Sequence, residues 1–276
     1  YRVSKVLNNN GVIAIDMDEN KEYVILGKGV GFGKKVSQRF DKPEGCTTYR
    51  LEQETERGSA KELVKGIEPE YLEIADAILT ESQKVFGDSI DRGILFPLAD
   101  HISFAVARIR RNEQISNPLT EDIKVLFYSE FKVAETLKTI LRERLQIEID
   151  DHEVGYVALH IHSAIGDEKV SVAMQTARAV RECIDMIEKA TGKPIDVLSL
   201  SYNRLMNHMK YMVARASTGE KLNLDMNEYM LDQYPQAYKV ATDICKNLEG
   251  CIGHKLDETE TGYLAMHIQR VYKDAV

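Results

Sequence analysis

Four of the seven histidines in this 276-residue chain occupy matching places. Shifting the sequence by 107 residues brings His101 onto His208, and the same shift brings His160 onto His267. A recurring imidazole could ligate a metal, act as a catalytic base, accept a phosphoryl group or serve only the fold. His160 and His162 point about 160° apart on a helix, so they cannot chelate one ion. Because no nucleophile or cofactor motif accompanies them, we rank phosphorylation or a pH switch slightly above a structural role, and we expect no catalytic residue, metal or cofactor.

The segments that carry these histidines have the pattern of amphipathic helices. Apolar residues recur at helical spacing around His101 and again around His160. On a helical wheel His160 lies about 120° from the centre of its apolar stripe, and His267 takes the same place in its copy. We therefore expect these imidazoles on the flank of a helical bundle, where a partner can reach them.

Three separate segments align at the same shift, which chance would not plausibly produce. They lie around His101 and His208, at 132–134 and 239–241, and at 153–161 and 260–268. The sequence therefore predicts two homologous helical domains of roughly 100 residues each. Pro69 is expected to open one helix, and Pro194 is expected in a break between two others.

The first 42 residues differ from the rest in charge and pattern. They carry eight basic and five acidic residues, whereas the whole chain has a net charge of −8. Short β-rich runs at 12–15 and 23–26 accompany the turn signal Asn10-Gly11. We predict a meander of about four antiparallel strands that needs a partner copy, because roughly 40 residues bury little core. A basic head on an acidic body indicates two different partners.

Residues 27–35 place glycine at every second position. In an extended strand the glycines would share one bare face, and Lys28, Val30, Phe32 and Lys34 would share the other. The bare face would admit another backbone or a nucleic acid, while cations beside an aromatic ring suit phosphate contact and base stacking. A flexible glycine-rich loop with incidental lysines is an equal alternative. The run matches neither a dinucleotide-binding fingerprint nor a P-loop.

Two motifs carry a resemblance to a known family. Lys-Val-Leu-Asn-Asn-Asn at 5–10, followed by Val-Ile-Leu-Gly-Lys-Gly-Val-Gly-Phe-Gly-Lys-Lys at 24–35, resembles the co-antiterminator RNA-binding domain of the BglG/SacY family. The doubled histidine pattern resembles that family's two phosphotransferase-system regulation domains. The glycine-rich run is most similar to the family's glucose-type branch.

The resemblance implies a bacterial transcription antiterminator, which binds a hairpin in a nascent leader RNA as a symmetric dimer and prevents the terminator from forming. Its RNA contacts would come from the asparagine-rich turn and the glycine-rich strand. They map onto Lys5, Asn8, Asn10, Gly27, Lys28, Gly29 and Phe32, to which the basic face adds Lys34. Gly11 stands where the family has an apolar residue, so we expect the first hairpin to be one residue longer and the asparagine contacts to be shifted.

The resemblance also implies regulation by phosphorylation. The phosphoryl-accepting residues would be His101, His160, His208 and His267. The sugar permease, enzyme II, would phosphorylate the first copy and inactivate the protein, and the phosphocarrier HPr would phosphorylate and activate the second. Arg108 and Arg215 are candidate phosphate partners, because each follows the first histidine of its copy by seven residues on the same helix face; the alternative is solvated surface arginines. Asp100 could orient the imidazole of His101, and Asn207 replaces it in the second copy.

We expect a mainly α chain, with a small antiparallel β RNA-binding domain followed by two homologous helical-bundle regulation domains. The expected boundaries are 1–55 for the β-domain, 56–66 for a linker, and 67–169 and 170–276 for the helical domains. Because we find no signal peptide, no apolar run of about 20 residues and no cysteine framework, we expect a cytoplasmic protein without membrane insertion. The alternatives are a DNA-binding activator, although the first 66 residues show no helix-turn-helix, and a phosphotransferase enzyme, for which we find no substrate motif.

Overall fold

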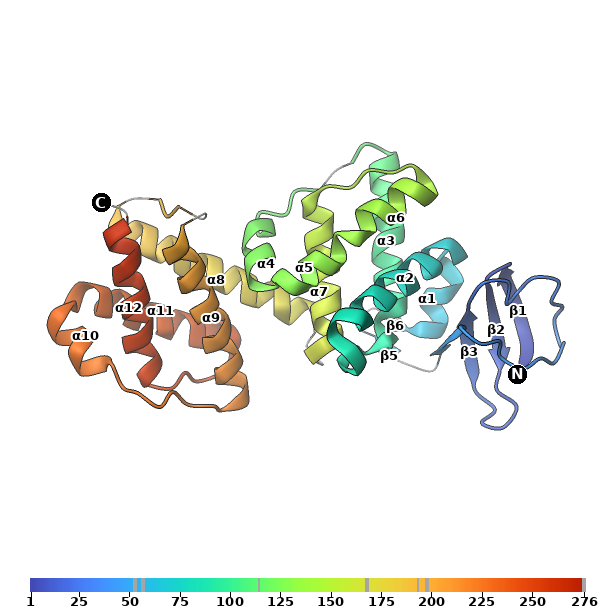
Figure 1. Ribbon diagram of the computed structural model, residues 1–276, viewed down its shortest axis with the longest axis horizontal. Helices are drawn as coiled ribbons and strands as arrows, with labels where there is room; N and C mark the ends of the chain where they lie inside the picture. The colour runs from blue at the N-terminus through green and yellow to red at the C-terminus, as the bar shows by residue number, and fades with distance from the viewer. Residues whose placement is uncertain are drawn as a thin grey trace. The chain divides into compact units, whose positions relative to one another are not determined.

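The computed structural model describes residues 1–51, 54–55, 58–113, 115–166, 169–192, 194–196 and 199–274. They divide into two compact units: unit 1 (residues 1–117 and 129–169) and unit 2 (residues 118–128 and 170–276). A small antiparallel sheet lies near the N-terminus and helices make up most of the remainder (Figure 1), so the expected fold class is confirmed. Within the described ranges, no helix combines the length and apolar character needed to span a bilayer.

Four short strands form an antiparallel meander. They are β1 (Arg2–Asn8), β2 (Gly11–Ile15), β3 (Glu22–Leu26) and β4 (Thr47–Arg50), hydrogen-bonded in that order. Side chains alternate along β2, and its inward residues Val12 and Ala14 form a buried core with Ile25 and Val30. A second pair of strands, β5 (Glu54–Thr55) and β6 (Gly58–Ser59), follows the meander.

The first hairpin is tighter than expected. Asn8 pairs with Gly11, so Asn9 and Asn10 alone form the turn. The predicted extra residue is wrong because Gly11 enters β2 and pairs with Leu26 of β3. A Cβ at this position would lie 3.2 Å from Cδ2 of Leu26, so the glycine leaves room for a core side chain.

The glycine-rich segment at 27–35 is not an extended strand, so the loop alternative describes its backbone better, and the fourth strand of the sheet is β4. The segment folds as successive turns, in which Val30, Phe32 and Lys34 donate to carbonyls three residues earlier at 3.1–3.2 Å. Gly29 and Gly33 have φ values of 74° and 67°, which glycine adopts without strain. Val30 is buried, whereas Phe32 is 74% exposed, so the two side chains do not share a face. The period-2 argument fails because turn hydrogen bonds, rather than a strand ladder, satisfy this backbone.

Gly31 nevertheless gives the close backbone approach that the glycine pattern indicated. Its N–H donates to the carbonyl of Asn9 at 2.9 Å, and a Cβ here would collide with the carbonyl oxygen of Asn8. The neighbouring Val30 enters the core of the sheet. The glycine-rich turns are therefore held directly against the first hairpin.

The helices of unit 1 follow the sheet. They are α1 (Ala60–Gly66), α2 (Pro69–Phe86), α3 (Leu95–Arg110), α5 (Tyr128–Ala134, all but its first residue), α6 (Thr136–Leu145) and α7 (Asp151–Gly166), with 3₁₀ turns η1 (Gly87–Ser89) and η2 (Arg92–Ile94). Ser59 caps α1 by accepting from the N–H of Glu62, and Pro69 opens α2 as predicted. The segment expected as a linker thus contains α1, whose Ala60 and Val64 are buried.

An ion pair joins the sheet to the helices of unit 1. Tyr49 of β4 donates its hydroxyl hydrogen to Asp76 of α2. Arg92 donates from Nη2 to the same carboxylate and to the Tyr49 oxygen, each at 2.8 Å. Because Tyr49 is buried, its hydroxyl needs such partners, and the three residues fix the last strand against α2.

Unit 2 contains the second copy of the repeat. Its helices are α4 (Thr120–Leu126), α8 (Val170–Thr191), α9 (Leu200–Thr218), α10 (Asn227–Gln233), α11 (Pro235–Ile252) and α12 (Thr259–Asp274). At the 107-residue shift α9 corresponds to α3 and α12 to α7, and Pro194 lies between α8 and α9 as predicted. Helix α4 packs on α8 and α9, whereas its counterpart α10 packs on α11 and α12. Residues 118–128 thus lie in unit 2, although we expected them in the first helical domain.

We expect Gly31→Ala to lower the free energy of unfolding by about 1–3 kcal/mol, the usual cost of overpacking, because its Cβ must displace the Asn8 backbone. Gly66→Ala, with no neighbour within 4 Å of the added carbon, is the matched control and is expected to change stability little. Urea unfolding of the full chain measures both variants, and equal midpoints would contradict the close approach at Gly31.

Candidate functional sites

In each unit two helices bring a pair of histidines together. In unit 1, α3 and α7 place the ring centroids of His101 and His160 5.3 Å apart. In unit 2, α9 and α12 place those of His208 and His267 4.8 Å apart, with the rings inclined by 25°. The sequence repeat is therefore a repeat of paired imidazoles, and each pair is built within one unit.

The histidines of unit 1 lie deeper than expected. His101 and His160 are 8% and 5% exposed, so the prediction of an open flank is wrong for both. All residues from 157 to 161 on α7 are buried, because α2 and α3 both pack on this helix and cover more than one stripe. In unit 2 the side chain of His208 is only 9% exposed, and His267 is half-buried.

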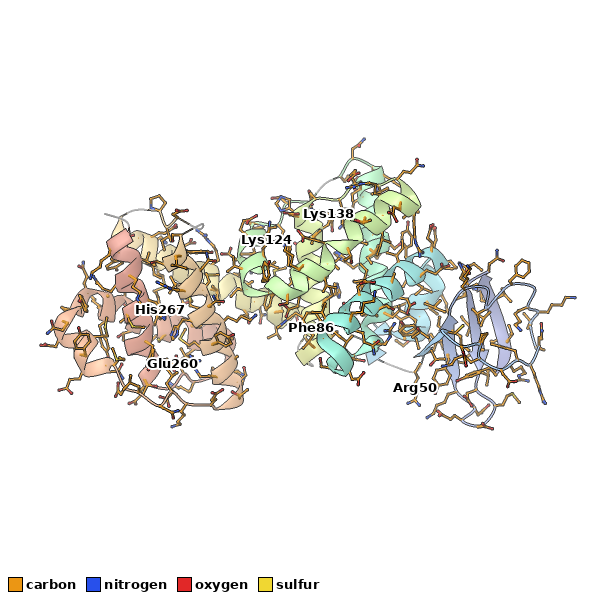
Figure 2. All side chains as sticks on the ribbon, in the orientation of Figure 1. Arg50, Phe86, Lys124, Lys138, Glu260 and His267 are labelled. Atoms are coloured by element: carbon orange, nitrogen blue, oxygen red, sulfur yellow. The ribbon has the colours of Figure 1, made fainter. Side chains whose placement is uncertain are left out.

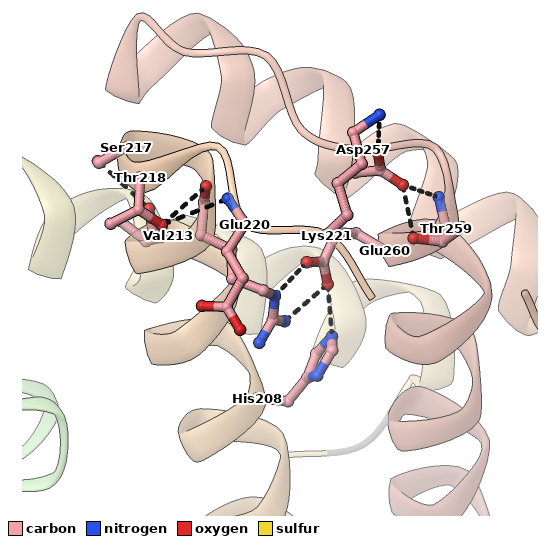
Figure 3. Close-up of polar contacts among 10 residues, drawn as sticks. His208, Val213, Ser217, Thr218, Glu220, Lys221, Asp257, Thr259 and Glu260 are labelled. Carbon is pink, nitrogen blue, oxygen red and sulfur yellow. Dashed lines mark hydrogen bonds and ion pairs between the residues drawn. The ribbon is translucent and has the colours of Figure 1, made fainter. Parts of the chain in front are cut away.

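A buried carboxylate faces the first histidine of the pair in unit 2. Oε2 of Glu260 lies 3.6 Å from Nε2 of His208 (Figure 3). Arg215 donates to the same carboxylate from Nε and Nη2, at 2.6 and 2.9 Å. Glu260 is only 1% exposed, so this two-point ion pair offsets the cost of burying its charge. Glu260 and His267 both belong to α12 (Figure 2).

The same arrangement occurs in unit 1. Nε2 of His101 lies 3.5 Å from Oε2 of Glu153, and Arg108 donates from Nη2 to Oε1 at 2.8 Å. Burial alone would raise the pKa of Glu153, but hydrogen bonds and charge from His101 and Arg108 more than offset it, and the pKa lies below its ordinary value. Glu153 is therefore an ionised carboxylate at neutral pH.

This geometry changes the interpretation of Arg108 and Arg215 as candidate phosphate partners. Arg108 and Arg215 each bind a carboxylate rather than standing as solvated surface arginines. The carboxylate beside the first imidazole comes from the other helix in both copies. The difference between Asp100 and Asn207 therefore does not decide whether a copy has an orienting carboxylate.

Sequence reasoning missed Glu153 and Glu260 as site residues, although a signal was present. Each begins an aligned segment with a tyrosine three residues later and the second histidine seven residues later. These positions share one helix face. Tyr156 contacts the ring of His101 and Tyr263 that of the equivalent histidine, with ring centroids 5.7 and 6.2 Å apart.

The imidazoles of unit 2 are neutral at pH 7. Burial lowers the pKa of His208 to about 3, with His267 and Arg215 contributing in the same direction. Burial likewise lowers the pKa of His267 to about 4, with contributions from Arg270 and Arg204. Each neutral ring keeps one nitrogen lone pair, which can act as a nucleophile. No group of three or more metal-ligating side chains occurs in the part of the chain that the structure describes.

The N-terminal site is built on the asparagine turn. Asn8 Oδ1 accepts from the N–H of Asn10 at 2.8 Å, and Asn10 Oδ1 accepts from the N–H of Gly29 at 3.0 Å. The two side chains therefore join the first hairpin and the glycine-rich turns into one surface.

The other predicted residues of this site differ in their surroundings. Lys5 and Lys28 are exposed, as is Phe32. Lys34 lies over the ring of Phe40, with Nζ 4.8 Å from the centroid. Gly27 serves packing, because a Cβ there would collide with Sγ of Cys46.

Helix α2 binds the amides of both asparagines. Asn8 Nδ2 donates to Oε1 of Glu73 at 2.7 Å, and Asn10 Nδ2 donates to Oε2 at 3.2 Å. Nη1 of Arg144, on α6, lies 3.6 Å from the same carboxylate. The asparagine turn is thus in contact with α2, which packs in turn on α3 and α7, the helices that carry the first histidine pair.

Comparison with known proteins relates both sites to one family. The model of the CAT RNA binding domain matches residues 1–58, and the model of the PRD domain matches residues 76–164 and 181–271. The GlcA/glcB genes antiterminator of Staphylococcus carnosus is 30% identical, covering 97% of this chain and 94% of its own length. The transcription antiterminator LicT of Bacillus subtilis is 27% identical, covering 99% of this chain and all of its own length.

A solved structure gives the same relation. The crystal structure of GlcT CAT-PRDI superimposes with a TM-score of 0.52 at 29% identity, covering 60% of this chain and 98% of that chain. The chain therefore belongs to the family of transcription antiterminators in which a CAT RNA-binding domain precedes two PRD domains. The suspected family is confirmed.

The lowered pKa of His208 predicts that acid destabilises unit 2. A folded pKa below the unfolded value near 6.5 leaves stability intact above pH 6.5 and removes it as the pH falls toward 3. At pH 5 the loss from His208 is about 2 kcal/mol relative to pH 7. Urea unfolding at both pH values should show a smaller loss for His208→Gln than for the wild type, whereas His254→Gln, at an exposed histidine, should match the wild type.

Proposed function

We propose that this chain binds an RNA hairpin in a nascent leader transcript, keeps the overlapping terminator from forming, and is controlled by phosphorylation of its paired histidines. The RNA surface is formed by Asn8, Asn10, Gly29 and Phe32, together with the exposed lysines Lys5 and Lys28. Lys34 adds positive charge at the edge of this surface, and Gly27 supports its shape.

The observation that carries the proposal is the surface that the asparagines organise within the matched CAT domain. Asn10 fixes the glycine-rich turns through the N–H of Gly29, and Phe32 stands exposed on those turns. An exposed ring beside cations suits the splayed bases of a looped RNA, which stack on aromatic side chains. A duplex of DNA presents no such bases.

The regulatory part of the proposal rests on the paired imidazoles. His101, His160, His208 and His267 are the phosphoryl acceptors, the permease enzyme II and the phosphocarrier HPr are the donors, and the active form is a cytoplasmic homodimer. A phosphoryl group adds close to two negative charges, which would meet the buried Glu153 or Glu260 carboxylate at each pair. Such a charge change can repack the helices that hold the pair. In this proposal the chain is a regulator and not an enzyme.

The homodimer is supported by exposed apolar side chains at equivalent places. Phe104 on α3 is 56% exposed and Tyr211 on α9 is 60% exposed, and each lies three residues after the first histidine of its pair. Large apolar side chains next to a regulatory residue suit a surface that is covered in one state and open in another.

Binding to a labelled RNA hairpin with internal loops, compared with the DNA of the same sequence at fixed salt, tests the proposed function. The full chain should prefer RNA, and Phe32→Ala should weaken binding by about 1–3 kcal/mol, the value of one stacked base. Val36→Ala removes another exposed apolar side chain nearby and should leave affinity unchanged. Equal affinity for RNA and DNA would remove the basis for the N-terminal assignment.

The contact with α2 predicts that Glu73 restrains RNA binding. Glu73→Ala should raise the RNA affinity of the full chain roughly tenfold, because RNA then need not displace two charge-assisted hydrogen bonds from the asparagine amides. Glu70→Ala removes the same charge from the same helix and serves as the control, because among the described residues the asparagine amides donate to Glu73 and not to Glu70. An affinity unchanged by Glu73→Ala, or raised equally by Glu70→Ala, would contradict this role.

A further inference from the structure

The two histidines of each pair bury different ring nitrogens. In His101 and His208 the buried nitrogen is Nε2, whereas in His160 and His267 it is Nδ1. The side chains of His101 and His208 keep 10% and 9% of their surface exposed, and Nε2 contributes almost none of it. A phosphoryl donor therefore reaches Nε2 of these two rings only if neighbouring atoms move.

The carboxylate decides where the proton sits on the first ring of the pair. A neutral imidazole carries one N–H, and the proton favours the nitrogen that faces a carboxylate. Oε2 of Glu260 lies 3.6 Å from Nε2 of His208, and Arg215 holds the carboxylate in place from two nitrogens. His208 then carries its proton on Nε2 and its lone pair on Nδ1.

We propose that Glu153 and Glu260 are positioning residues that direct phosphoryl transfer to Nδ1 of His101 and His208, while the second histidine of each pair accepts on Nε2. The inference rests on the proposed function, because it assigns the nitrogen for a phosphorylation that the proposed function supplies. To the proposed function it adds two positioning residues and the acceptor nitrogen of each ring.

Phosphoryl transfer to His208 does not require the ring to release its proton. The Nδ1 lone pair of His208 attacks the phosphorus of the donor's phosphohistidine, and a new N–P bond forms. The donor's N–P bond breaks, and its electron pair stays on the donor nitrogen. His208 keeps the proton on Nε2, so its ring becomes a phosphorylated imidazolium. The Glu260 carboxylate faces that developing positive charge, as the carboxylate does in a catalytic triad.

Transfer to Nε2 of His208 would need a different arrangement of the side chains around that nitrogen. The phosphoryl group would have to occupy the space of a carboxylate that is 1% exposed and held by Arg215. Removing one partner of such a buried ion pair is strongly unfavourable. The same obstacle to transfer at Nε2 exists in unit 1, where Glu153 lies between Nε2 of His101 and Arg108.

The protonated nitrogen of His208 can be measured on the unphosphorylated full chain by long-range ¹H–¹⁵N correlation NMR. We expect the Nε2–H tautomer in the wild type and a shift toward a mixture in Glu260→Gln, with recovery in Glu260→Asp. Glu258→Gln, an exposed carboxylate two residues earlier, should leave the tautomer unchanged. A wild-type Nδ1–H tautomer would overturn the proposal without any variant.

The phosphorylated nitrogen is read after incubation with HPr that is kept phosphorylated. Peptides containing His208 and His267 are separated and probed with antibodies selective for the Nδ1 or the Nε2 isomer of phosphohistidine. We expect the Nδ1 isomer at His208 and the Nε2 isomer at His267, and a rate at His208 that is roughly 10- to 100-fold lower in Glu260→Gln.

The possible outcomes distinguish the positioning role of the two glutamates from the proposed function. The Nε2 isomer at His208 would overturn the positioning role and leave the proposed function intact. No phosphohistidine at either site, with HPr and with the small donor phosphoramidate, would overturn the regulatory part of the proposed function. An unchanged rate and isomer in a folded Glu260→Gln would show that the carboxylate is only structural.

Discussion

The buried ion pair between an arginine and a glutamate, once in each unit, is the interaction on which both histidine sites depend. Glu260 has almost no exposed surface, and only the two hydrogen bonds from Arg215 make its charge tolerable there. The pair also joins α9 to α12, the helices that carry the two histidines. The same element that holds the bundle together therefore fixes the environment of the imidazoles.

This constraint makes the histidine pairs sensitive to charge. In unit 2 the two neutral rings have centroids 4.8 Å apart, and the carboxylate beside them accepts two hydrogen bonds from Arg215. Any added negative charge must compete with that carboxylate for the arginine or be accommodated on the opposite side of the ring. A packed bundle responds to such competition by changing between discrete arrangements rather than by deforming smoothly.

In unit 1 the sheet is bound to helix α2 at two places. Tyr49 and Arg92 meet Asp76, and the asparagine turn meets Glu73 one helical turn earlier. Helix α2 packs in turn on α3, which carries His101. A contiguous set of packed residues thus connects the first imidazole pair with the asparagine turn.

The sequence by itself determined the mainly α class, the N-terminal meander, the doubled histidines and the family, because these depend on local pattern and on an internal repeat. It also placed strands at 12–15 and 23–26, where β-branched and aromatic residues are concentrated. It left residues 27–35 open between a strand and a glycine-rich loop, because an alternation of glycines does not distinguish an extended strand from successive turns when two of the glycines adopt positive φ.

Only the tertiary structure decided which groups meet. The burial of His101 and His160 depends on helices that cover α7 from more than one side, which a single helical wheel does not contain. The partners of Arg108 and Arg215 lie on another helix, and the partner of Asn8 and Asn10 lies on α2, far along the chain. Periodicity reports which face of one element is apolar, whereas ion pairs between elements follow from how those faces pack.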